Sequence, residues 1–471
     1  MDNYLNMDTY LDRVSAQIRS RRARDMAVAE IRAHIEDQAE AYCAEGMEEA
    51  EAVKEAVRQM GDPVKAGVEL DRIHRPKMEW RLFLWIMAFS ILGLGLQYLC
   101  FYRFGEAVGG SMNYFVRQCM YTAAGLLAMT AVCLCDYSIL GTHPQVFGGC
   151  FLGGLALVCM SGIPPIYNGA YGYLKCLMYF FIPVYAGILY GNRGKGLTGV
   201  TAGAAWTGAA FLTGTAAIGG GLSVTGDVTV VCGAMLCAAV WKEWFGVSRK
   251  KGLTAVSLLF AAAVILLAVN LKPYQMARFQ AFFRPEDFEQ TIGYHLSQIR
   301  KIVSGLTLTG AGGSVLNQAD LLRRFVGAEV GSEYMILQSA VVLGLAGTLV
   351  LCAAYALFFW YLLSMAVREK NSLGMITALG CTLILVLETV RNVMYNFGLG
   401  LVSTAGIPFF SYGKVHTLAV YGILGVLLSI YSHRAVAWEK PVSANGKASE
   451  EGKIKALRIG KYVIHVEKTE G

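Results

Sequence analysis

The stretch MILQSAVVLGLAGTLVLCAAYALFFWYL, residues 335–362, contains no charged side chain. A membrane-spanning helix needs about 20 consecutive, mostly apolar residues, so this stretch is long enough to cross a bilayer. Nine other mostly apolar stretches of similar length occur between residue 80 and residue 432, some of them with one or a few charged residues. The ten predicted spans are 80–101, 117–139, 143–161, 173–190, 197–217, 227–246, 252–271, 335–362, 373–395 and 415–432. This pattern predicts an all-α, polytopic membrane protein of about ten transmembrane helices.

The overall composition agrees with a membrane protein. Hydrophobic residues make up 55% of the 471 residues and charged residues only 16%, which excludes a disordered chain. The net charge of +7 is carried by loop ends and tails and not by a basic stripe with interleaved aromatic residues. We therefore expect the positive charges to face anionic membrane lipids and expect no nucleic-acid partner.

The charges of the connecting segments predict how the chain is oriented. Basic residues favour cytoplasmic loops, and most of the connections on one side of the predicted membrane are poor in them. The basic residues of the other side are Arg193, Lys195, Lys242, Arg249, Lys250, Lys251, Arg368 and Lys370. Both termini are therefore expected in the cytoplasm. The large loop between spans 7 and 8, about residues 272–334, is expected to be extracytoplasmic.

Residues 1–78 precede the first predicted span and are expected to form a small cytoplasmic helical domain. Leu11, Val14 and Ile18 recur at the three- and four-residue steps of an amphipathic helix, as do Met26, Ile31 and Ile35 at slightly wider steps. The segment AVRQMGDPVKAGVELDRIHRP resembles the permease-prefix (HAAS-type) domain of bacterial membrane proteins. That resemblance implies tethering or signalling, and not catalysis.

The membrane domain is expected to cover residues 79–435, and a polar cytoplasmic tail follows at residues 436–471. Within the tail, ALRIGKYVIHVEK alternates between apolar and polar side chains. Alternation of this kind predicts a short strand or hairpin.

Two features of the outer loop suggest chemistry. Arg278 and Arg284 near its start suit a ligand with phosphate groups, because guanidinium groups bind phosphate oxygens through paired hydrogen bonds. Composition alone favours a simpler interpretation, an interfacial helix with solvated cations. Glu333 lies at the mouth of the eighth span, where a partly buried carboxylate could act as a general base. Its position is explained as well by a helix dipole that favours negative charge.

The ninth span contains polar side chains in an apolar helix. Arg391 and Asn392 lie three and four residues after Glu388, so the three share one helical face and can pair. Two interpretations stay open, because polar groups inside a span either line a cavity or hold neighbouring helices together. The loop GLGLVSTAGIPFFSYGK that follows is non-helical in pattern, and such backbone must be buried in protein or line a cavity.

The order of these motifs resembles that of the shape, elongation, division and sporulation (SEDS) family, which includes FtsW, RodA and SpoVE. The resemblance covers most of residues 80–435, and its second-span motif is FVRQCMYTAAGLLAM followed by Asp136 and Tyr137. The outer-loop matches are Arg278, Phe282, Pro285, Gly293, Tyr294, Gln298, Ser304 and Gly305. The stretch from Glu388 to Gly413 is similar to a family Gln-x-x-x-Asn motif that ends in Pro-x-x-Ser-Tyr-Gly.

The chain departs from the family pattern at several positions. Ser332-Glu333-Tyr334 stands where the family has Thr-Asp-Phe, whose Asp is taken to be catalytic, and Val341-Val342 replaces a pair of glutamates. Gly310-Ala311-Gly312 replaces Gly-Lys-Gly, and Gly413-Lys414-Val415-His416 replaces Gly-Gly-x-Ser. The family's Gln-Pro-Ser-Glu motif is not visible near the fourth span.

The resemblance implies a peptidoglycan glycosyltransferase-like protein of the bacterial cytoplasmic membrane that joins lipid II into glycan strands at the outer face. Glu333 is the implied catalytic carboxylate. The implied substrate contacts are Arg278, Gln298, Glu388, Arg391, Asn392, Ser411 and Tyr412. A divalent cation, Mg²⁺ or Mn²⁺, is an open option for stabilising the pyrophosphate that leaves, and no other cofactor is implied. The implied protein partner is a class B penicillin-binding protein transpeptidase.

Two alternatives to catalysis stay open. A degenerate relative that binds lipid II or a cell-wall synthase partner without transferring sugar is favoured by the lost glutamate pair and the altered loop residues. A flippase for lipid-linked precursors is weaker, because no inverted repeat of broken helices is evident.

Overall fold

The computed structural model describes residues 6–19, 21–74, 77–104, 113–161, 172–217, 222–269, 273–288, 290–291, 293–309, 333–400, 406–434, 456–459 and 462–465. It divides into two compact units. One unit comprises residues 1–82 with 428–438, and the other comprises residues 83–427 with 439–471.

The first unit contains a four-helix domain. Its helices are α1 (Met7–Gln17), α2 (Arg21–Ala44), α3 (Glu49–Gln59) and α4 (Pro63–His74). The predicted apolar positions are confirmed, since Leu11, Val14, Ile18, Ile31 and Ile35 all belong to its buried core; the Met26 side chain lies outside the described part.

Two glycines shape this domain. Gly61 ends α3 with a left-handed φ of 75°, a conformation that glycine adopts without steric cost. Gly67 lets α4 approach α1 closely, because a Cβ atom placed there would lie 2.7 Å from the carbonyl oxygen of Val14. Helices α1 and α4 can therefore pack at close range.

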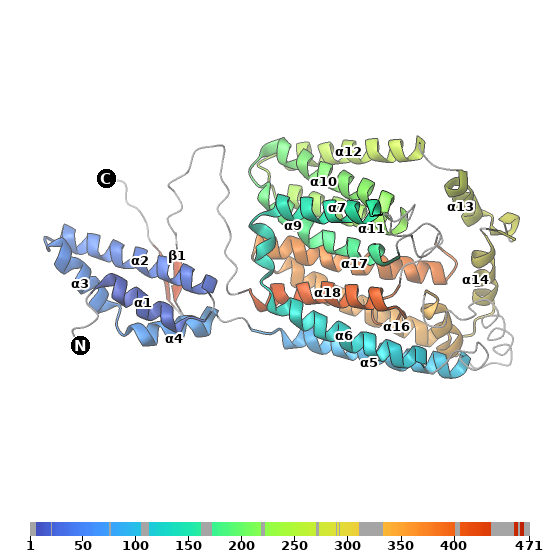
Figure 1. Ribbon diagram of the computed structural model, residues 1–471, viewed down its shortest axis with the longest axis horizontal. Helices are drawn as coiled ribbons and strands as arrows, with labels where there is room; N and C mark the ends of the chain where they lie inside the picture. The colour runs from blue at the N-terminus through green and yellow to red at the C-terminus, as the bar shows by residue number, and fades with distance from the viewer. Residues whose placement is uncertain are drawn as a thin grey trace. The chain divides into compact units, whose positions relative to one another are not determined.

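The second unit is built almost entirely of helices, which confirms the all-α prediction. Its bundle helices are α5 (Trp80–Phe104, whose first residues belong to the first unit), α6 (Asn113–Leu134), α7 (Pro144–Met160), α8 (Gly172–Leu177), α9 (Phe181–Gly191), α10 (Gly196–Ala217), α11 (Leu222–Trp241), α12 (Arg249–Val269), α16 (Met335–Val367), α17 (Ser372–Asn396) and α18 (Lys414–Ser432). Short 3₁₀ helices are η3 (Tyr137–Gly141) and η4 (Met178–Phe180). Helices α6, α7, α9, α10, α11, α12, α16 and α17 run side by side as a bundle (Figure 1).

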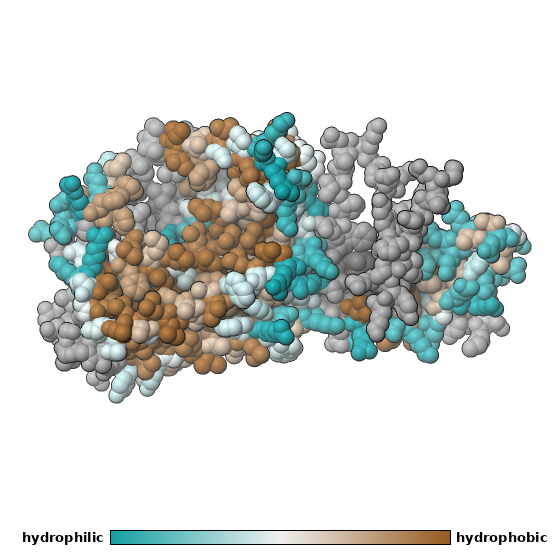
Figure 2. All heavy atoms as spheres, turned by 180° about the vertical axis from the view of Figure 1, so that it is seen from behind, coloured by the Kyte–Doolittle hydropathy of each residue, from teal (hydrophilic) through white to brown (hydrophobic). Residues whose placement is uncertain are grey.

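Each predicted span coincides with a helix, and the fourth coincides with the series α8, η4 and α9. Within the described ranges, five helices are long and apolar enough to cross a membrane, and two shorter apolar helices accompany them. Apolar side chains form a broad band over the bundle on the face shown in Figure 2. Leu127 on α6 and Leu157 on α7 are about 70% exposed, as lipid-facing residues would be. The chain is thus a multi-pass membrane protein, and the count of ten spans stays a prediction.

The predicted eighth span is not one continuous helix. Gly344, with φ 75° and ψ 175°, divides α16 into a short first part and a longer second part. The backbone N–H groups of Leu345 and Ala346 donate instead to the carbonyl oxygens of Thr307 and Leu308, at 3.0 Å each. The outer loop thus replaces the helical hydrogen bonds that the break removes.

The described part of the outer loop lies at one end of the bundle (Figure 1). It contains α13 (Pro273–Phe283), η5 (Pro285–Phe288) and α14 (Tyr294–Ser304). The Arg300 guanidinium on α14 donates to the carbonyl oxygen of Phe282 at 3.1 Å and to that of Gly398 at 3.2 Å. Arg300 therefore ties the loop to the end of α17. Residues 310–332, with the predicted Gly310-Ala311-Gly312 and Ser332, lie outside the described residues.

The tail contains the predicted hairpin. Strands β1 (Ala456–Ile459) and β2 (Tyr462–His465) pair in antiparallel register, with Ala456 opposite His465. No other strand occurs in the part of the chain that the structure describes.

Candidate functional site

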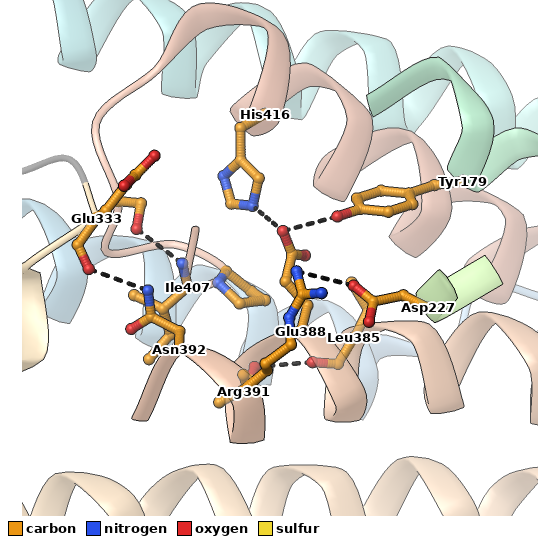
Figure 3. A network of polar contacts seen from close by, with 12 residues as sticks. Tyr179, Asp227, Glu333, Leu385, Glu388, Arg391, Asn392, Ile407 and His416 are labelled. Atoms are coloured by element: carbon orange, nitrogen blue, oxygen red, sulfur yellow. Dashed lines mark hydrogen bonds and ion pairs between the residues drawn. The ribbon is translucent and has the colours of Figure 1, made fainter. Parts of the chain in front are cut away.

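The backbone of Glu333 is held by two buried asparagines of α17. The side-chain amides of Asn392 and Asn396 both donate to the Glu333 carbonyl oxygen, at 3.0 Å and 2.9 Å. The Asn396 side-chain oxygen also accepts from the N–H of Leu337, at 3.0 Å, in the first turn of α16. Both asparagine side chains are fully buried. Figure 3 shows the Glu333 carbonyl facing Asn392 while the carboxylate points away from it.

Tyr334 adds a second anchor beside Glu333. Its side chain is buried, and its hydroxyl lies 3.2 Å from Nδ1 of His295 on α14 and 3.4 Å from the hydroxyl of Tyr395 on α17. The start of α16 is therefore connected to the outer loop and to α17. Because the Glu333 carbonyl oxygen and the Tyr334 side chain are both held by hydrogen bonds, the backbone at Glu333 has little freedom to move.

A second polar cluster is buried deeper in the bundle, around Glu388. The Tyr179 hydroxyl of η4 donates to Glu388 Oε1 at 2.9 Å, and Nε2 of His416 on α18 lies 3.0 Å from the same oxygen. Glu388 is only 1% exposed. Its other oxygen, Oε2, is buried and has no hydrogen-bond partner among the described residues.

Arg391 forms an ion pair with a different carboxylate. Its Nη2 lies 2.9 Å from Oδ2 of Asp227 on α11, and the two side chains are 22% and 6% exposed. The expected pairing of Arg391 with Glu388 along one helix is therefore not the arrangement found. Arg391 is paired with Asp227 of α11, whereas Glu388 contacts Tyr179 of η4 and His416 of α18 (Figure 3).

The other predicted site residues are separate from these clusters or serve local structure. Ser411 is buried, and its hydroxyl accepts from the N–H of Ile407 at 2.7 Å. The ring of Tyr412 packs against those of Tyr114 and Tyr121, with centroids 5.5 Å and 6.2 Å away. Arg278 lies exposed on α13, and Gln298 lies half-buried on α14.

Three members of the cluster around Glu388 were not predicted from the sequence, namely Asp227, Tyr179 and His416. Asp227 carried a usable signal, because it is a carboxylate at the start of a predicted span. Neither Tyr179 nor His416 carried a sequence signal that identified Glu388 as the common partner, since they lie 209 and 28 residues from it in sequence.

The two clusters suit different tasks. The Glu333 side chain is partly exposed on a fixed backbone, which is what a general base for an external substrate requires. The Glu388 cluster is closed to such a substrate by its burial. Within the described ranges, no group of three or more His, Cys, Asp or Glu side chains could hold a metal ion. The divalent cation therefore stays a prediction, and the described residues offer no cluster of ligands for it.

Comparison with known families gives two matches. A family model for FtsW, RodA and SpoVE, described as cell cycle protein, matches residues 209–436, and a HAAS model matches residues 9–66. The chain is 29% identical over 180 residues to the peptidoglycan glycosyltransferase MrdB of Escherichia coli strain K12, which covers 38% of this chain and 48% of that protein. It is 26% identical over 175 residues to the putative peptidoglycan glycosyltransferase FtsW of Mesostigma viride, covering 37% of this chain and 41% of that one. The chain spans about half the length of the curated relatives it matches.

Solved structures show the same fold. A chain from a peptidoglycan synthase complex, solved in a study of polymerization and crosslinking, matches with a TM-score of 0.57 at 20% identity. A variant of the rod shape determining protein RodA of Thermus thermophilus matches with a TM-score of 0.50 at 17% identity. Each match covers 76% of this chain and 98% of the other.

Proposed function

The chain belongs to the SEDS family of FtsW, RodA and SpoVE proteins, and from that premise we propose that it is a peptidoglycan glycosyltransferase-like protein. Its substrate is lipid II, the undecaprenyl-pyrophosphate-linked disaccharide-pentapeptide. The reaction takes place at the outer face of the bacterial cytoplasmic membrane, during cell-wall synthesis for division, shape or sporulation. Curated relatives named as peptidoglycan glycosyltransferases support this choice.

The proposed chemistry is a single displacement with Glu333 as general base. The Glu333 carboxylate takes the proton of an acceptor sugar hydroxyl, and the resulting oxygen attacks the anomeric carbon of a donor lipid II. The bond between that carbon and the donor's pyrophosphate breaks, and lipid pyrophosphate leaves with the electron pair. Arg278, exposed on α13, is the proposed contact for the pyrophosphate, because guanidinium groups bind phosphate oxygens.

The observation that carries this proposal is the double amide contact on the Glu333 carbonyl. Two fully buried asparagines donate to one backbone oxygen. An ordinary boundary carboxylate needs no such support, whereas a general base must be held close to its productive position. We therefore assign Asn392 and Asn396 to positioning of Glu333 and not to substrate contact. Glu388 and Arg391 are assigned to the interior of the bundle, because Glu388 is buried and Arg391 is paired with the buried Asp227.

A second candidate is a relative that binds lipid II, or a class B penicillin-binding protein, without transferring sugar. The observation that favours it is the buried apolar side chain of Val341. This residue is 2% exposed, and it stands where the family pattern has a carboxylate. The synthase complex among the structural neighbours supports a protein partner of this kind. A relative that binds lipid II would share its lipid ligand with the glycosyltransferase, so lipid binding alone does not separate the two candidates.

The decisive experiment compares polymerisation of labelled lipid II by the purified full chain and by three variants in lipid nanodiscs. Glu333→Gln should fold normally and lose polymerisation, because an amide cannot take a proton. Glu333→Asp restores the family residue and should retain activity. Glu286→Gln is the matched control, since it removes an exposed carboxylate of the same loop.

The outcomes separate the two candidates. Polymerisation by wild type that survives Glu333→Gln would remove Glu333 from the mechanism. Lipid II binding without polymerisation by wild type, with or without a transpeptidase partner, would establish the binding protein. In both cases Arg278→Ala should weaken lipid binding, because recognition of charge does not require turnover.

A further inference from the structure

Two connections between helices lie at the end of the bundle opposite the outer loop, one from α9 to α10 and one from α11 to α12 (Figure 1). These connections and the first turn of α12 carry five exposed cations, which we call the basic surface: Lys195, Lys242, Arg249, Lys250 and Lys251. We propose that the basic surface binds the phosphate groups of anionic phospholipids in the membrane leaflet at this end of the bundle. The inference goes beyond the proposed function, because its ligand is a membrane phospholipid and its test does not depend on glycan synthesis.

Backbone hydrogen bonds hold the two connections against each other. The N–H of Gly194 donates to the carbonyl oxygen of Trp244, and the N–H of Gly196 donates to that of Phe245, at 2.8 Å each. The two glycines have left-handed φ values of 75° and 65°, a conformation that glycine adopts without steric cost. Trp244 and Phe245 are buried. The two connections therefore form one surface with a defined arrangement of charges, and not two independent loops.

Side chains add to this junction. The guanidinium carbon of Arg193 lies 4.0 Å from the ring centroid of Tyr190 and 5.7 Å from that of Trp244, within the range of a cation–π contact. Nζ of Lys195 donates to Oδ1 of Asn192 at 2.9 Å. The positive-inside rule requires only that basic residues are present in a loop, whatever their arrangement. A role in setting the orientation of the chain therefore does not account for this structure.

The protein itself neutralises little of the basic surface. Glu243 is the one acidic residue in the sequence of the two connections, and its Oε1 lies 3.0 Å from Nε of Arg249. Among the residues that the structure describes, no carboxylate forms an ion pair with any of the four lysines. The four ammonium groups are therefore available to an anion from outside the protein.

The stability of α12 does not explain its three cations either. Arg249, Lys250 and Lys251 occupy the first turn of this helix. The helix dipole is positive at that end, so cations there are unfavourable for the helix. Negative charge bound across the basic surface would offset this repulsion.

Exposed apolar side chains beside the cations favour a lipid over a soluble acidic protein. Trp241 ends a helix that is long and apolar enough to cross a membrane, and it is 59% exposed. The guanidinium carbon of Arg249 lies 5.5 Å from the centroid of its ring. Leu197, in the first turn of α10, is 51% exposed. Indole rings prefer the headgroup layer of a bilayer, and lysines in that layer attract anionic lipids. The basic surface therefore lies where lipid phosphates are found.

The experiment measures which lipids the purified full chain retains in detergent. The chain is titrated with phosphatidylglycerol and phosphatidylcholine of the same acyl chains, and the lipid that remains bound after gel filtration is quantified by mass spectrometry. Wild type should retain phosphatidylglycerol preferentially. Each lysine near a lipid surface contributes a factor of about five in affinity, so Lys250→Gln/Lys251→Gln should weaken phosphatidylglycerol binding about 25-fold and leave phosphatidylcholine binding unchanged. Arg368→Gln/Lys370→Gln is the matched control, because it removes two exposed cations from the connection between α16 and α17.

Three outcomes would overturn the proposal. The first is equal retention of the two lipids by wild type, and the second is an equal loss of phosphatidylglycerol in the two double variants. The third is binding of polyglutamate by wild type without a preference for phosphatidylglycerol, which would assign the basic surface to an acidic protein. If Lys250→Gln/Lys251→Gln does not fold, the salt dependence of wild type decides. An increase from about 0.1 M to about 1 M salt shortens the screening length from about 10 Å to about 3 Å, so the preference for phosphatidylglycerol should be lost. A preference that does not change with salt would contradict recognition by charge.

Discussion

Arg391→Leu is expected to destabilise the membrane domain strongly, because it leaves Asp227 as a buried carboxylate without its guanidinium partner. The Asp227 side chain is 6% exposed, and the pair is joined at 2.9 Å. Removal of one member of a buried ion pair typically costs about 3–5 kcal/mol, whereas replacing both members with apolar side chains recovers much of that loss. The double variant Asp227→Leu/Arg391→Leu should therefore be more stable than Arg391→Leu alone.

A matched double variant identifies the partner of Arg391. Glu388→Leu/Arg391→Leu should be less stable than Arg391→Leu, because it also removes the acceptor for Tyr179 and His416 and leaves buried donors unpaired, at about 1–3 kcal/mol. The free energy of unfolding is measured by SDS titration of the purified chain in detergent micelles, followed by tryptophan fluorescence. Strictly additive losses for Asp227 and Arg391, or relief of the Arg391 loss by Glu388→Leu, would refute this reasoning.

Three other predictions follow from the structure. Asn396→Ala should reduce lipid II polymerisation more than lipid II binding, because it loosens the backbone of Glu333 without touching its carboxylate; equal loss of both would contradict a positioning role. Gly344→Ala should lower the unfolding free energy by about 1–3 kcal/mol, because its φ of 75° is strained for any other residue, and an unchanged melting temperature would argue against the break in α16. Cysteine labels at Arg249 and Glu286 should react from opposite sides of the membrane, with Glu286 outside, and labelling of both from one side would disprove the predicted orientation.

Much of the fold could be predicted because it depends on local periodicity. Apolar stretches of span length coincide with helices throughout the bundle, and Leu11, Val14 and Ile18 mark the core of the prefix domain before any contact is known. The break at Gly344 could not be predicted in this way. It is stable only because the carbonyl oxygens of Thr307 and Leu308, remote in sequence, accept the freed N–H groups.

The candidate site was predictable in part. The position of Glu333 at the mouth of a span, and its place in a family motif, identified it as a candidate base. The residues that hold Glu333 in place were not predicted. Asn392 was expected to contact substrate, and it donates instead to the Glu333 carbonyl oxygen. The spacing of Glu388 and Arg391 correctly placed them on one helical face. Spacing along one helix does not show which neighbouring helices supply their partners.

The sequence by itself determined the class of this protein: a helical prefix domain, an apolar multi-span bundle and the order of motifs that relates it to SEDS proteins. These properties follow from the period of the helix and from the thickness of the bilayer. Each segment of the chain can meet both requirements without contacts to other segments. Only the tertiary structure decided that Asp227 pairs with Arg391 and that Glu388 meets His416. The physical reason is that a charge buried in an apolar bundle must find its partner wherever the packing of helices brings one, and that packing joins residues far apart in the chain.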